Sequence, residues 1–357
     1  MRRPWASRAG GPAFALLAAG LILACSGPAS PAPSPTWQRS AGAFEGLNPI
    51  AAVSDGFFIR DGHKSWFSSD GILWQGIGNF PVESTGEQPS AQVPRGLFEG
   101  GTYRYSGPSS GCDTNGVGPC QPFVIRSTDG RTWESGERLP GGPAALKSVV
   151  RFGPGFVAVG DSGGNCQEHA ATWVSGDGQA WERVPEQPAF EGAGMEIVLA
   201  LERVVVALGR DSCFDINEMA ELRGTVHAWI SPDGRTWSKA DVPACECYFR
   251  FAAVGGGRAI MAMGAEGWAA YETSDGSAWA RLDGILSDMN ALAWDGARFV
   301  GVGAEVWFSA DGRTWTESFK PDRPLEWVMA GPRGIVAGGT NYDVARDGGF
   351  VWALPRP

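Results

Sequence analysis

Short apolar runs rich in Val, Phe and Trp alternate with Gly and Asp along most of the chain. The clearest example begins at Asn290, continues through Phe299 and Val306, and reaches Trp315. Runs of this length, bounded by turn residues, are typical of β-strands, and no stretch is long or periodic enough to predict a helix. The pattern therefore predicts an all-β protein.

One seven-residue phrase, Ser-x-Asp-Gly-x-x-Trp, follows the third apolar run of that segment and recurs along the chain. Six clear copies begin at Ser68, Ser127, Ser175, Ser231, Thr273 and Ser309, and a degraded copy runs from Ala345 to Trp352. Successive motif aspartates lie 36 to 59 residues apart, at Asp70, Asp129, Asp177, Asp233, Asp275, Asp311 and Asp347. A repeat of this period indicates an array of similar units.

The phrase combines a tight turn with a large apolar side chain. Asp-Gly between two apolar runs is a strong hairpin signal, so we interpret the motif aspartates as structural residues of turns and not as catalysts. The motif Trp is expected to fill the space between neighbouring sheets. A second aromatic layer precedes the motif Ser by two residues, at Trp66, Trp173, Trp229, Tyr271 and Trp307. Packing accounts for most of these rings, so the high Trp content does not by itself indicate a sugar-binding platform.

Four-stranded units that repeat around an axis describe a β-propeller. The sequence thus predicts a seven-bladed β-propeller of four-stranded antiparallel blades that occupies residues 36–357 as a single domain. Two ways of closing the ring remain open. Thr36-Trp37 resembles the Thr-Trp that ends several copies of the phrase, which favours an N-terminal segment as the outer strand of the last blade. The complete-looking seventh unit favours closure without it.

The phrase resembles the Asp box, or BNR repeat, of sialidases and of many non-catalytic seven-bladed propellers. In that family one residue usually separates Asp from Gly, whereas here the two are adjacent in six copies and only Asp347-Gly348-Gly349 has the family spacing. The resemblance implies a propeller fold. It also implies that the box is a structural turn remote from the face that binds ligands.

The first 25 residues have the features of a targeting segment. Arg2, Arg3 and Arg8 precede a short apolar stretch, and Ile22-Leu23-Ala24-Cys25 resembles a bacterial lipobox, which would make Cys25 the site of lipidation. Residues 26–35 form a Pro-rich tether. We therefore expect a signal peptide over residues 1–25 and a protein that is lipid-anchored to the cell membrane on its extracytoplasmic side. Ordinary cleavage and an uncleaved anchor are the alternatives.

Charge and cysteine content limit the kinds of partner and ligand that the protein is expected to have. A net charge of −10 without any Lys/Arg run argues against nucleic acid. Six cysteines besides Cys25, in an export context, favour disulfides over metal ligands. Cys112 and Cys120 lie in one Gly-rich loop and are expected to pair, whereas the sequence leaves open the pairing of Cys166, Cys213, Cys245 and Cys247. We expect a monomer that needs neither a cofactor nor a metal.

Insertions gather at one end of the predicted blades. Antiparallel strands place alternate turns at opposite ends, and the insertions 106–121, 161–170 and 210–226 fall at the end away from the Asp-Gly turns, as do the connections 76–92 and 185–194. We call this end the looped face and the other the box face. Loops clustered on one face of a rigid scaffold are where binding is usually found.

A ring of polar residues is expected on the looped face. Aligning the units on the Gly that ends each second strand places a polar or charged residue where each innermost strand begins, at the mouth of the axial channel. These mouth residues are Asn48, Arg95, Lys147, Glu196, Arg250, Asn290 and Glu326. Polar strand ends are common in any case, so the ring is either a simple solvated edge or a set of charges that orients a polar ligand.

Two functions fit these observations. The first is a membrane-tethered binding module for a carbohydrate or protein ligand on the looped face. The second is a sialidase-like glycoside hydrolase, which would need three Arg, a Tyr nucleophile paired with Glu, and an Asp acid/base. Arg95 and Arg250 supply two arginines, and Tyr248 and Tyr342 lie nearest the looped face, but no third Arg matches. A hydrolase with two carboxylates, Glu196 and Glu326, is a further variant. The residues favour binding over catalysis.

Overall fold

Strands make up nearly all of the regular structure in the described part of this protein. The computed structural model describes residues 36–40, 44, 47–61, 64–79, 97–99, 102–106, 122–127, 133–142, 144–164, 167–211, 213–215, 220–222, 224–340 and 348–356. The expected signal peptide, Cys25 and the tether lie outside these residues. Within the described ranges, no helix has the length and apolar character needed to cross a membrane.

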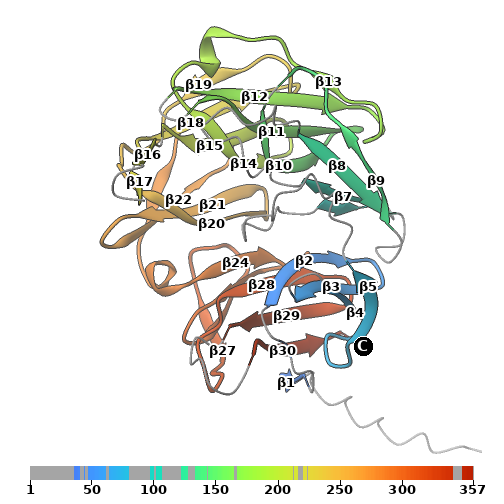
Figure 1. Cartoon of the computed structure of the whole chain (residues 1–357). Coiled ribbons are helices and arrows are strands. Elements are labelled where there is room, and N and C mark those ends of the chain that lie inside the picture. Colours follow the sequence, from blue (N-terminus) through green and yellow to red (C-terminus); the bar gives the residue numbers. More distant parts are fainter. Residues whose placement is uncertain are drawn as a thin grey trace, which may run out of the picture. The chain divides into compact units, whose positions relative to one another are not determined.

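The described residues form seven four-stranded antiparallel sheets, which we call blades 1 to 7 in chain order (Figure 1). Blade 1 contains β2 (Leu47–Val53), β3 (Gly56–Asp61), β4 (Lys64–Ser68) and β5 (Gln75–Asn79). Blade 2 contains β6 (Leu97–Glu99), β7 (Thr102–Ser106), β8 (Phe123–Ser127) and β9 (Trp133–Arg138). Blade 3 contains β10 (Ala145–Phe152), β11 (Gly155–Gly164), β12 (Gln167–Ser175) and β13 (Glu182–Arg183).

The second half of the chain repeats this order. Blade 4 contains β14 (Gly194–Ala200), β15 (Val205–Arg210), β18 (Val226–Ser231) and β19 (Ser238–Ala240). Blade 5 contains β20 (Tyr248–Gly255), β21 (Arg258–Gly264), β22 (Trp268–Thr273) and β23 (Ala280–Leu282). Blade 6 contains β24 (Ala291–Trp294), β25 (Phe299–Val302), β26 (Val306–Ser309) and β27 (Thr316–Phe319). Blade 7 contains β28 (Trp327–Gly331), β29 (Gly334–Gly339), β30 (Phe350–Pro355) and β1 (Gln38–Arg39).

The first strands of the blades contact one another in a closed cycle. Along the chain, β2 contacts β6, β6 contacts β10, and the series continues through β14, β20, β24 and β28, which returns to β2. Every strand in each blade is antiparallel to its neighbour. The predicted seven-bladed β-propeller of four-stranded antiparallel blades is therefore confirmed.

The ring is closed by the N-terminal segment. β1 pairs with β30, with Gln38 opposite Ala353 and Arg39 opposite Trp352, so it is the fourth strand of blade 7. The ring of Trp37 stacks on Phe319 with centroids 5.4 Å apart. Of the two closures left open by the sequence, the structure has the one that Thr36-Trp37 favoured.

This closure shows that the motif Trp of the seventh copy of the phrase was assigned wrongly. Trp352, interpreted as the motif Trp of that copy, lies inside β30, opposite Ala337 of the second strand. Trp66 and Trp173 have the same place in their third strands, opposite Ile59 and Ala158. Trp352 thus belongs to the second aromatic layer, and Trp37 stands where the motif Trp of blade 7 is expected. Asp347 lies outside the described residues.

The apolar core lies mainly between neighbouring blades. One cluster joins Val157 and Val159 of blade 3 to Val205 and Trp229 of blade 4, and similar clusters lie between the later blades and between blades 7 and 1. Trp173 and Trp229 are fully buried. Their indole N–H groups donate to the carbonyl oxygens of Pro140 and Ala189 at 2.9 and 2.6 Å, so the rings are buried without loss of hydrogen bonding.

Four of the described Asp-Gly turns also pack against the preceding blade. The motif glycines have positive φ, between +73° and +78° at Gly71, Gly234, Gly276 and Gly312, a region that side chains disfavour. A Cβ at Gly312 would lie 2.4 Å from Cδ1 of Ile260 in blade 5, and a Cβ at Gly71 would lie 2.5 Å from Cγ2 of Val336 in blade 7. The motif therefore requires Gly for two reasons, its backbone conformation and the close approach of the preceding blade's sheet.

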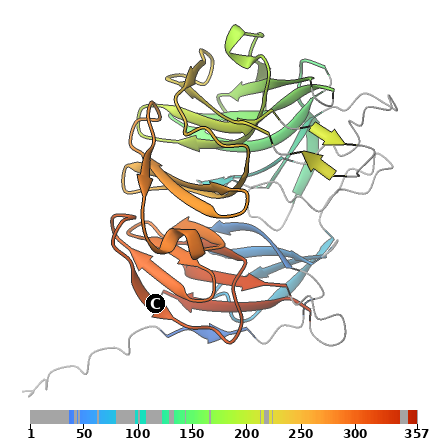
Figure 2. The same ribbon diagram turned by 90° about the vertical axis from the view of Figure 1, so that its left-hand side faces the viewer.

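The looped face carries an extra hairpin. β16 (Cys213–Asp215) and β17 (Ala220–Leu222) pair with each other between the second and third strands of blade 4, within the insertion 210–226. The hairpin, coloured yellow in Figure 2, forms a sheet of its own and joins none of the blades. Two 3₁₀ turns, Pro188–Phe190 and Ile285–Asp288, lead into β14 and β24. The predicted insertion on this face thus has structure of its own.

The motif glycine provides a direct test of the joint between blades. Gly312→Ala is expected to destabilise the protein by about 2–4 kcal/mol, because a side chain would be strained at this φ and would overpack Ile260. Gly176→Ala is the matched control, since a Cβ at this position of the blade 3 phrase meets nothing within 4 Å. Urea unfolding of both variants measures the difference. Equal stability of the two would show that the glycine does not limit the approach of the blades.

Candidate functional site

Three of the predicted mouth residues are the extra residues of β-bulges in the first strands. The register of the first two strands shifts between Leu146 and Ser148, between Met195 and Ile197, and between Phe249 and Phe251. Lys147, Glu196 and Arg250 occupy these bulges. A bulge leaves one residue unpaired and turns its side chain away from the regular alternation of the strand. The polar residues are therefore placed by a backbone irregularity that recurs from blade to blade.

Asn290 and Glu326 have the same place in blades 6 and 7. The backbone N–H of Asn290 donates to the carbonyl of Val302, although Val302 is the register partner of Ala291. Glu326 N–H likewise donates to the carbonyl of Gly338, the partner of Trp327. In both blades two consecutive residues share one partner, as in the bulges of the earlier blades.

Blade 1 departs from the predicted alignment. Asn48 pairs regularly with Arg60, and the register shift comes two residues later, between Pro49 and Ala51. The bulge position of this blade is therefore Ile50. The sequence alignment failed because it counted back from Gly62, whereas Ile59 is the residue that pairs just before the shift. Arg95 of blade 2 lies outside the described residues.

Three of these residues have a partner within their own blade. Lys147 Nζ lies 3.4 Å from Asp161 Oδ2, and Arg210 Nε donates to Glu196 Oε1 at 2.9 Å. Glu326 Oε2 accepts from the hydroxyl of Thr340 at 2.9 Å. Each partner follows its mouth residue by 14 positions and lies in the second strand or directly after it. Sequence reasoning missed these partners, although the recurring spacing of polar residues could have revealed them.

Further contacts link blades 4, 5, 6 and 7 in succession. The guanidinium of Arg210 lies 4.9 Å from the ring centre of Tyr248 in blade 5. Arg250 of blade 5 donates to the carbonyl of Ser287 at 3.0 Å and to Asn290 Oδ1 in blade 6. Asn290 Nδ2 then donates to the carbonyl of Leu325, before blade 7, at 2.8 Å. From blade 4 to blade 7 the mouth is thus a continuous belt of polar contacts.

The belt leaves some charge accessible to solvent. The side chains of Lys147 and Glu196 are 38% and 29% exposed, whereas that of Arg210 is only 8% exposed. Burial raises the pKa of Asp161, and the neighbouring Lys147 ammonium opposes that rise. Burial also lowers the pKa of Arg250, and the negative charge of Asp288 opposes that fall. Lys147 and Glu196 are therefore the mouth charges best placed to meet a ligand.

One disulfide is present among the described residues, between Cys245 and Cys247, with Cα atoms 5.4 Å apart. It lies at the start of blade 5 on the looped face, just before Tyr248. Cys245 accepts from Val226 N–H and Cys247 donates to the carbonyl of Gly224, which fastens this segment to the end of the extra-hairpin insertion. The predicted pair Cys112 and Cys120 and the loop residue Cys166 lie outside the described residues. In the described ranges no group of His, Cys, Asp or Glu side chains could hold a metal ion.

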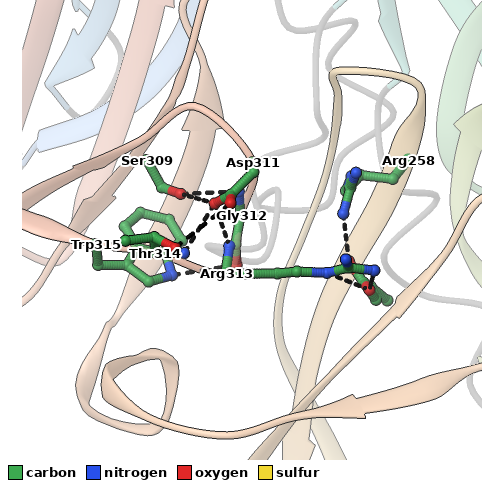
Figure 3. Close-up of polar contacts among 8 residues, drawn as sticks. Arg258, Ser309, Asp311, Gly312, Arg313, Thr314 and Trp315 are labelled. Carbon is green, nitrogen blue, oxygen red and sulfur yellow. Dashed lines mark hydrogen bonds and ion pairs between the residues drawn. The ribbon is translucent and has the colours of Figure 1, made fainter.

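The motif aspartates lie in turns and accept hydrogen bonds from the backbone. In blade 6, Asp311 Oδ1 accepts from the N–H groups of Arg313 and Thr314 at 2.9 and 2.8 Å, and Ser309 Oγ donates to it at 3.0 Å (Figure 3). Asp70, Asp177, Asp233 and Asp275 accept from their own turns in the same way. Asp129 lies outside the described residues. Each described carboxylate is thus committed to its own turn on the box face.

The residue after the motif Gly adds an ion pair between its own blade and the preceding one. Arg313 reaches from blade 6 to Glu272 of β22 in blade 5, and Arg258 of β21 donates to the other oxygen of that carboxylate at 2.8 Å (Figure 3). Glu272 is buried, with 8% of its side chain exposed. Two guanidinium groups around one buried carboxylate satisfy its charge, as a buried acid requires. This triad links blades 5 and 6.

Comparison with solved structures identifies the class of fold. The chain is similar to the WD40 domain of Pan2 from Neurospora crassa, with a TM-score of 0.59 and 10% identity over 91% of this chain and 97% of that one. It is also similar to YCF48 in a structure with D1 peptide, with a TM-score of 0.53 and 12% identity over 90% and 97% of the two chains. These likenesses show a β-propeller.

A third similar structure is an enzyme. An inactive variant of virginiamycin B lyase from Staphylococcus aureus, with quinupristin, has a TM-score of 0.55 and 8% identity over 89% of this chain and 99% of that one. No family model matches the chain, and no curated protein matches it in sequence. At these identities the comparisons define the fold and leave the site to be argued from its own residues.

The hydrogen bonds to the motif aspartates predict sensitivity to acid. The N–H groups of Thr314 and Arg313 lower the pKa of Asp311 from its ordinary value of 3.8 to about 2. A lowered pKa in the folded state stabilises the protein above the unfolded pKa, and this contribution is lost as the pH falls from about 4 towards 2. Melting temperatures recorded over that window are expected to fall steeply. Asp311→Asn, which cannot ionise, is expected to have a shallower acid limb than the native chain. Parallel acid limbs would contradict the assignment.

Proposed function

We propose that this protein is an extracytoplasmic binding module, tethered to the membrane through Cys25, that holds a carbohydrate or protein ligand on its looped face. It works as a monomer and needs no cofactor. The propeller supplies a rigid frame, and the ligand meets the channel mouth and the loops around it. The closed ring of first strands supports this role, because it fixes the relative positions of residues from different blades.

The observation that carries the proposal is the reversal of charge between adjacent blades. At equivalent positions, blade 3 has Lys147 with Asp161 and blade 4 has Glu196 with Arg210. Packing alone does not require opposite orders at two places that the repeat makes alike. Two charges of opposite sign at the mouth, each fixed by a partner, form a polar surface that selects a ligand by its own charges and hydroxyl or amide groups.

The same geometry supports binding more than hydrolysis. A retaining or inverting glycosidase needs two carboxyl groups that face each other across the scissile bond, one of them able to donate a proton. Glu196 is held by the guanidinium of Arg210, and Glu326 accepts from the backbone and hydroxyl of Thr340. Both carboxylates are thus engaged with groups of their own blades. Arg250 is similarly engaged with blade 6, so it serves the joint between blades.

Neutral variants at the mouth test the ligand site. Lys147→Gln and Glu196→Gln are expected to weaken ligand binding at least tenfold, since each removes a fixed charge while keeping a side chain of similar size. Glu202→Gln, in an exposed turn at the other end of blade 4, is the control and should bind like the native protein. Glycan and peptide arrays probed with all four proteins measure the effect. If both mouth variants bind every array component as the native protein does, the mouth is not the site.

The tether has a separate test. Cys25→Ala is expected to move the protein from the membrane fraction to the soluble extracytoplasmic fraction, because it removes the acceptor of the lipid. Cell fractionation followed by detection of the protein measures the shift, and Ser26→Ala is the control. Retention of Cys25→Ala in the membrane fraction would support an uncleaved anchor instead of lipidation.

A further inference from the structure

The repeat places the same notch between successive blades on the box face, and its contents differ. Between blades 5 and 6 the notch holds the triad of Glu272, Arg258 and Arg313 (Figure 3). The carboxylate of this triad is buried, whereas the side chain of Arg313 is 60% exposed. The corresponding notch between blades 3 and 4 is identified by register. Phe156 pairs with Ser175, and Ala259 pairs with Thr273, the first residue of the phrase in each blade. Val174 therefore stands where blade 5 has Glu272.

Because blade 3 has Val174 in place of that carboxylate, the motif arginine of blade 4 has a different partner. Arg235, the counterpart of Arg313, has no acid to meet inside the notch. It makes a bidentate ion pair with Glu182 of β13 instead, at 2.9 and 2.7 Å. Both side chains of this pair are largely exposed, at 50% and 61%. The notch between blades 5 and 6 thus has a buried carboxylate bound by two arginines, whereas the one between blades 3 and 4 has Val174 at that place and an exposed ion pair beside it.

The result is an open groove of about 410 Å³. Its lining includes Phe152, Phe156, Val174 and the partly exposed ring of Trp181, with Glu182 and Arg235 at the edge. Gly155, which stands where blade 5 has Arg258, also lines the groove, and a Cβ there would lie 2.5 Å from the carbonyl oxygen of Ser175. The present backbone therefore leaves no room for a side chain at Gly155 that could fill the groove.

We propose that this groove, which we call the 3/4 notch, binds a hexopyranose ring. An aromatic floor with polar groups at one edge matches the two surfaces of such a ring, whose C–H face is apolar and whose hydroxyl groups project from its edge. Each sugar hydroxyl both donates and accepts hydrogen bonds. A guanidinium beside a carboxylate offers the complementary donors and acceptors within one exposed pair. The volume is of the order of a small-molecule site, for which about 300–1,000 Å³ is typical.

The 3/4 notch lies at the opposite end of the blades from the mouth. It is formed by the turn between the first two strands of blade 3 and by the phrases of blades 3 and 4, whereas the mouth lies where the first strands begin. The sugar site therefore stands or falls independently of the proposed ligand on the looped face. Trp181 is one motif Trp whose ring serves a ligand as well as the packing of its blade.

The experiment uses the whole protein and a defined set of probes. Methyl α- and β-pyranosides of glucose, galactose and mannose, and their 1,4-linked disaccharides, are titrated up to about 50 mM while saturation-transfer NMR and Trp fluorescence are recorded. At least one probe is expected to bind with a dissociation constant in the millimolar range. Trp181→Ala and Glu182→Gln are each expected to weaken it at least tenfold. Glu182→Gln is at an exposed position, so folding does not limit its interpretation.

A closing variant provides the sharpest test. Val174→Glu places an acid where blade 5 has Glu272, so the added carboxylate is expected to occupy the groove and to pair with Arg235, with loss of sugar binding and an unchanged far-ultraviolet circular dichroism spectrum. Arg313→Gln, in the notch between blades 5 and 6, is the matched control and is expected to keep the native affinity. The proposal is overturned if no probe binds the native protein, or if Trp181→Ala and Glu182→Gln both bind as tightly as it does. Binding of apolar peptides without any sugar would likewise overturn it and assign the notch to a protein.

Discussion

The joint between the Asp-Gly turn of one blade and the sheet of the preceding blade is the contact on which this structure depends. The motif Gly brings the turn so close that a Cβ would collide with Ile260 in one joint and with Val336 in another. The motif Asp and Ser hold the turn in shape through backbone hydrogen bonds, and the motif Trp donates its indole N–H to the Gly carbonyl in four described copies. One short phrase thus specifies both a local turn and the distance between neighbouring sheets. Because the ring closes on itself, this spacing must hold at every joint, including the one between blades 7 and 1.

A fixed joint allows single positions to change without loss of the fold. Glu272 in blade 5 and Val174 in blade 3 occupy equivalent places, yet the first is a buried carboxylate bound by two arginines and the second lines a groove with an apolar floor. The mouth varies in the same way, since the lysine–aspartate pair of blade 3 is replaced by a glutamate–arginine pair in blade 4. The scaffold is set by the residues that recur, and local chemistry is set by those that do not. This division is the reason that a propeller fold by itself does not indicate a function.

The polar residues of the mouth have two roles: some link neighbouring blades and others present charge to solvent. Arg250 and Asn290 fasten blades 5, 6 and 7 together, and their hydrogen-bonding groups face protein carbonyls and amides. Lys147 and Glu196 are held by partners in their own blades and keep an exposed portion. Rigidity at the mouth lowers the entropic cost of binding, because charges that are already fixed lose little freedom when a ligand arrives. The blades whose mouth residues bind the next blade thus support the blades whose mouth residues present charge.

Much of the architecture is determined by the sequence alone, because the fold is built from a repeated local signal. The period of the phrase, its turn chemistry and its apolar runs act within a few residues, so the linear chain is enough to indicate strands, blades and a single ring. The placement of Lys147, Glu196, Arg250, Asn290 and Glu326 at equivalent points of their blades also follows from counting, because the hairpin of the first two strands has the same residue spacing in these blades. The same counting fails for Asn48, where the bulge lies two residues away, and for Trp352, which belongs to a third strand.

Other features were decided only by the tertiary structure. The sequence left open whether β1 closes the ring, and it did not indicate that mouth residues pair with residues 14 positions further along the chain. Nor did it indicate that Arg235 pairs with an exposed Glu182 whereas Arg313 reaches a buried Glu272. These features depend on contacts between segments far apart in the chain, and the residues involved carry no local pattern that distinguishes a filled space from an open one.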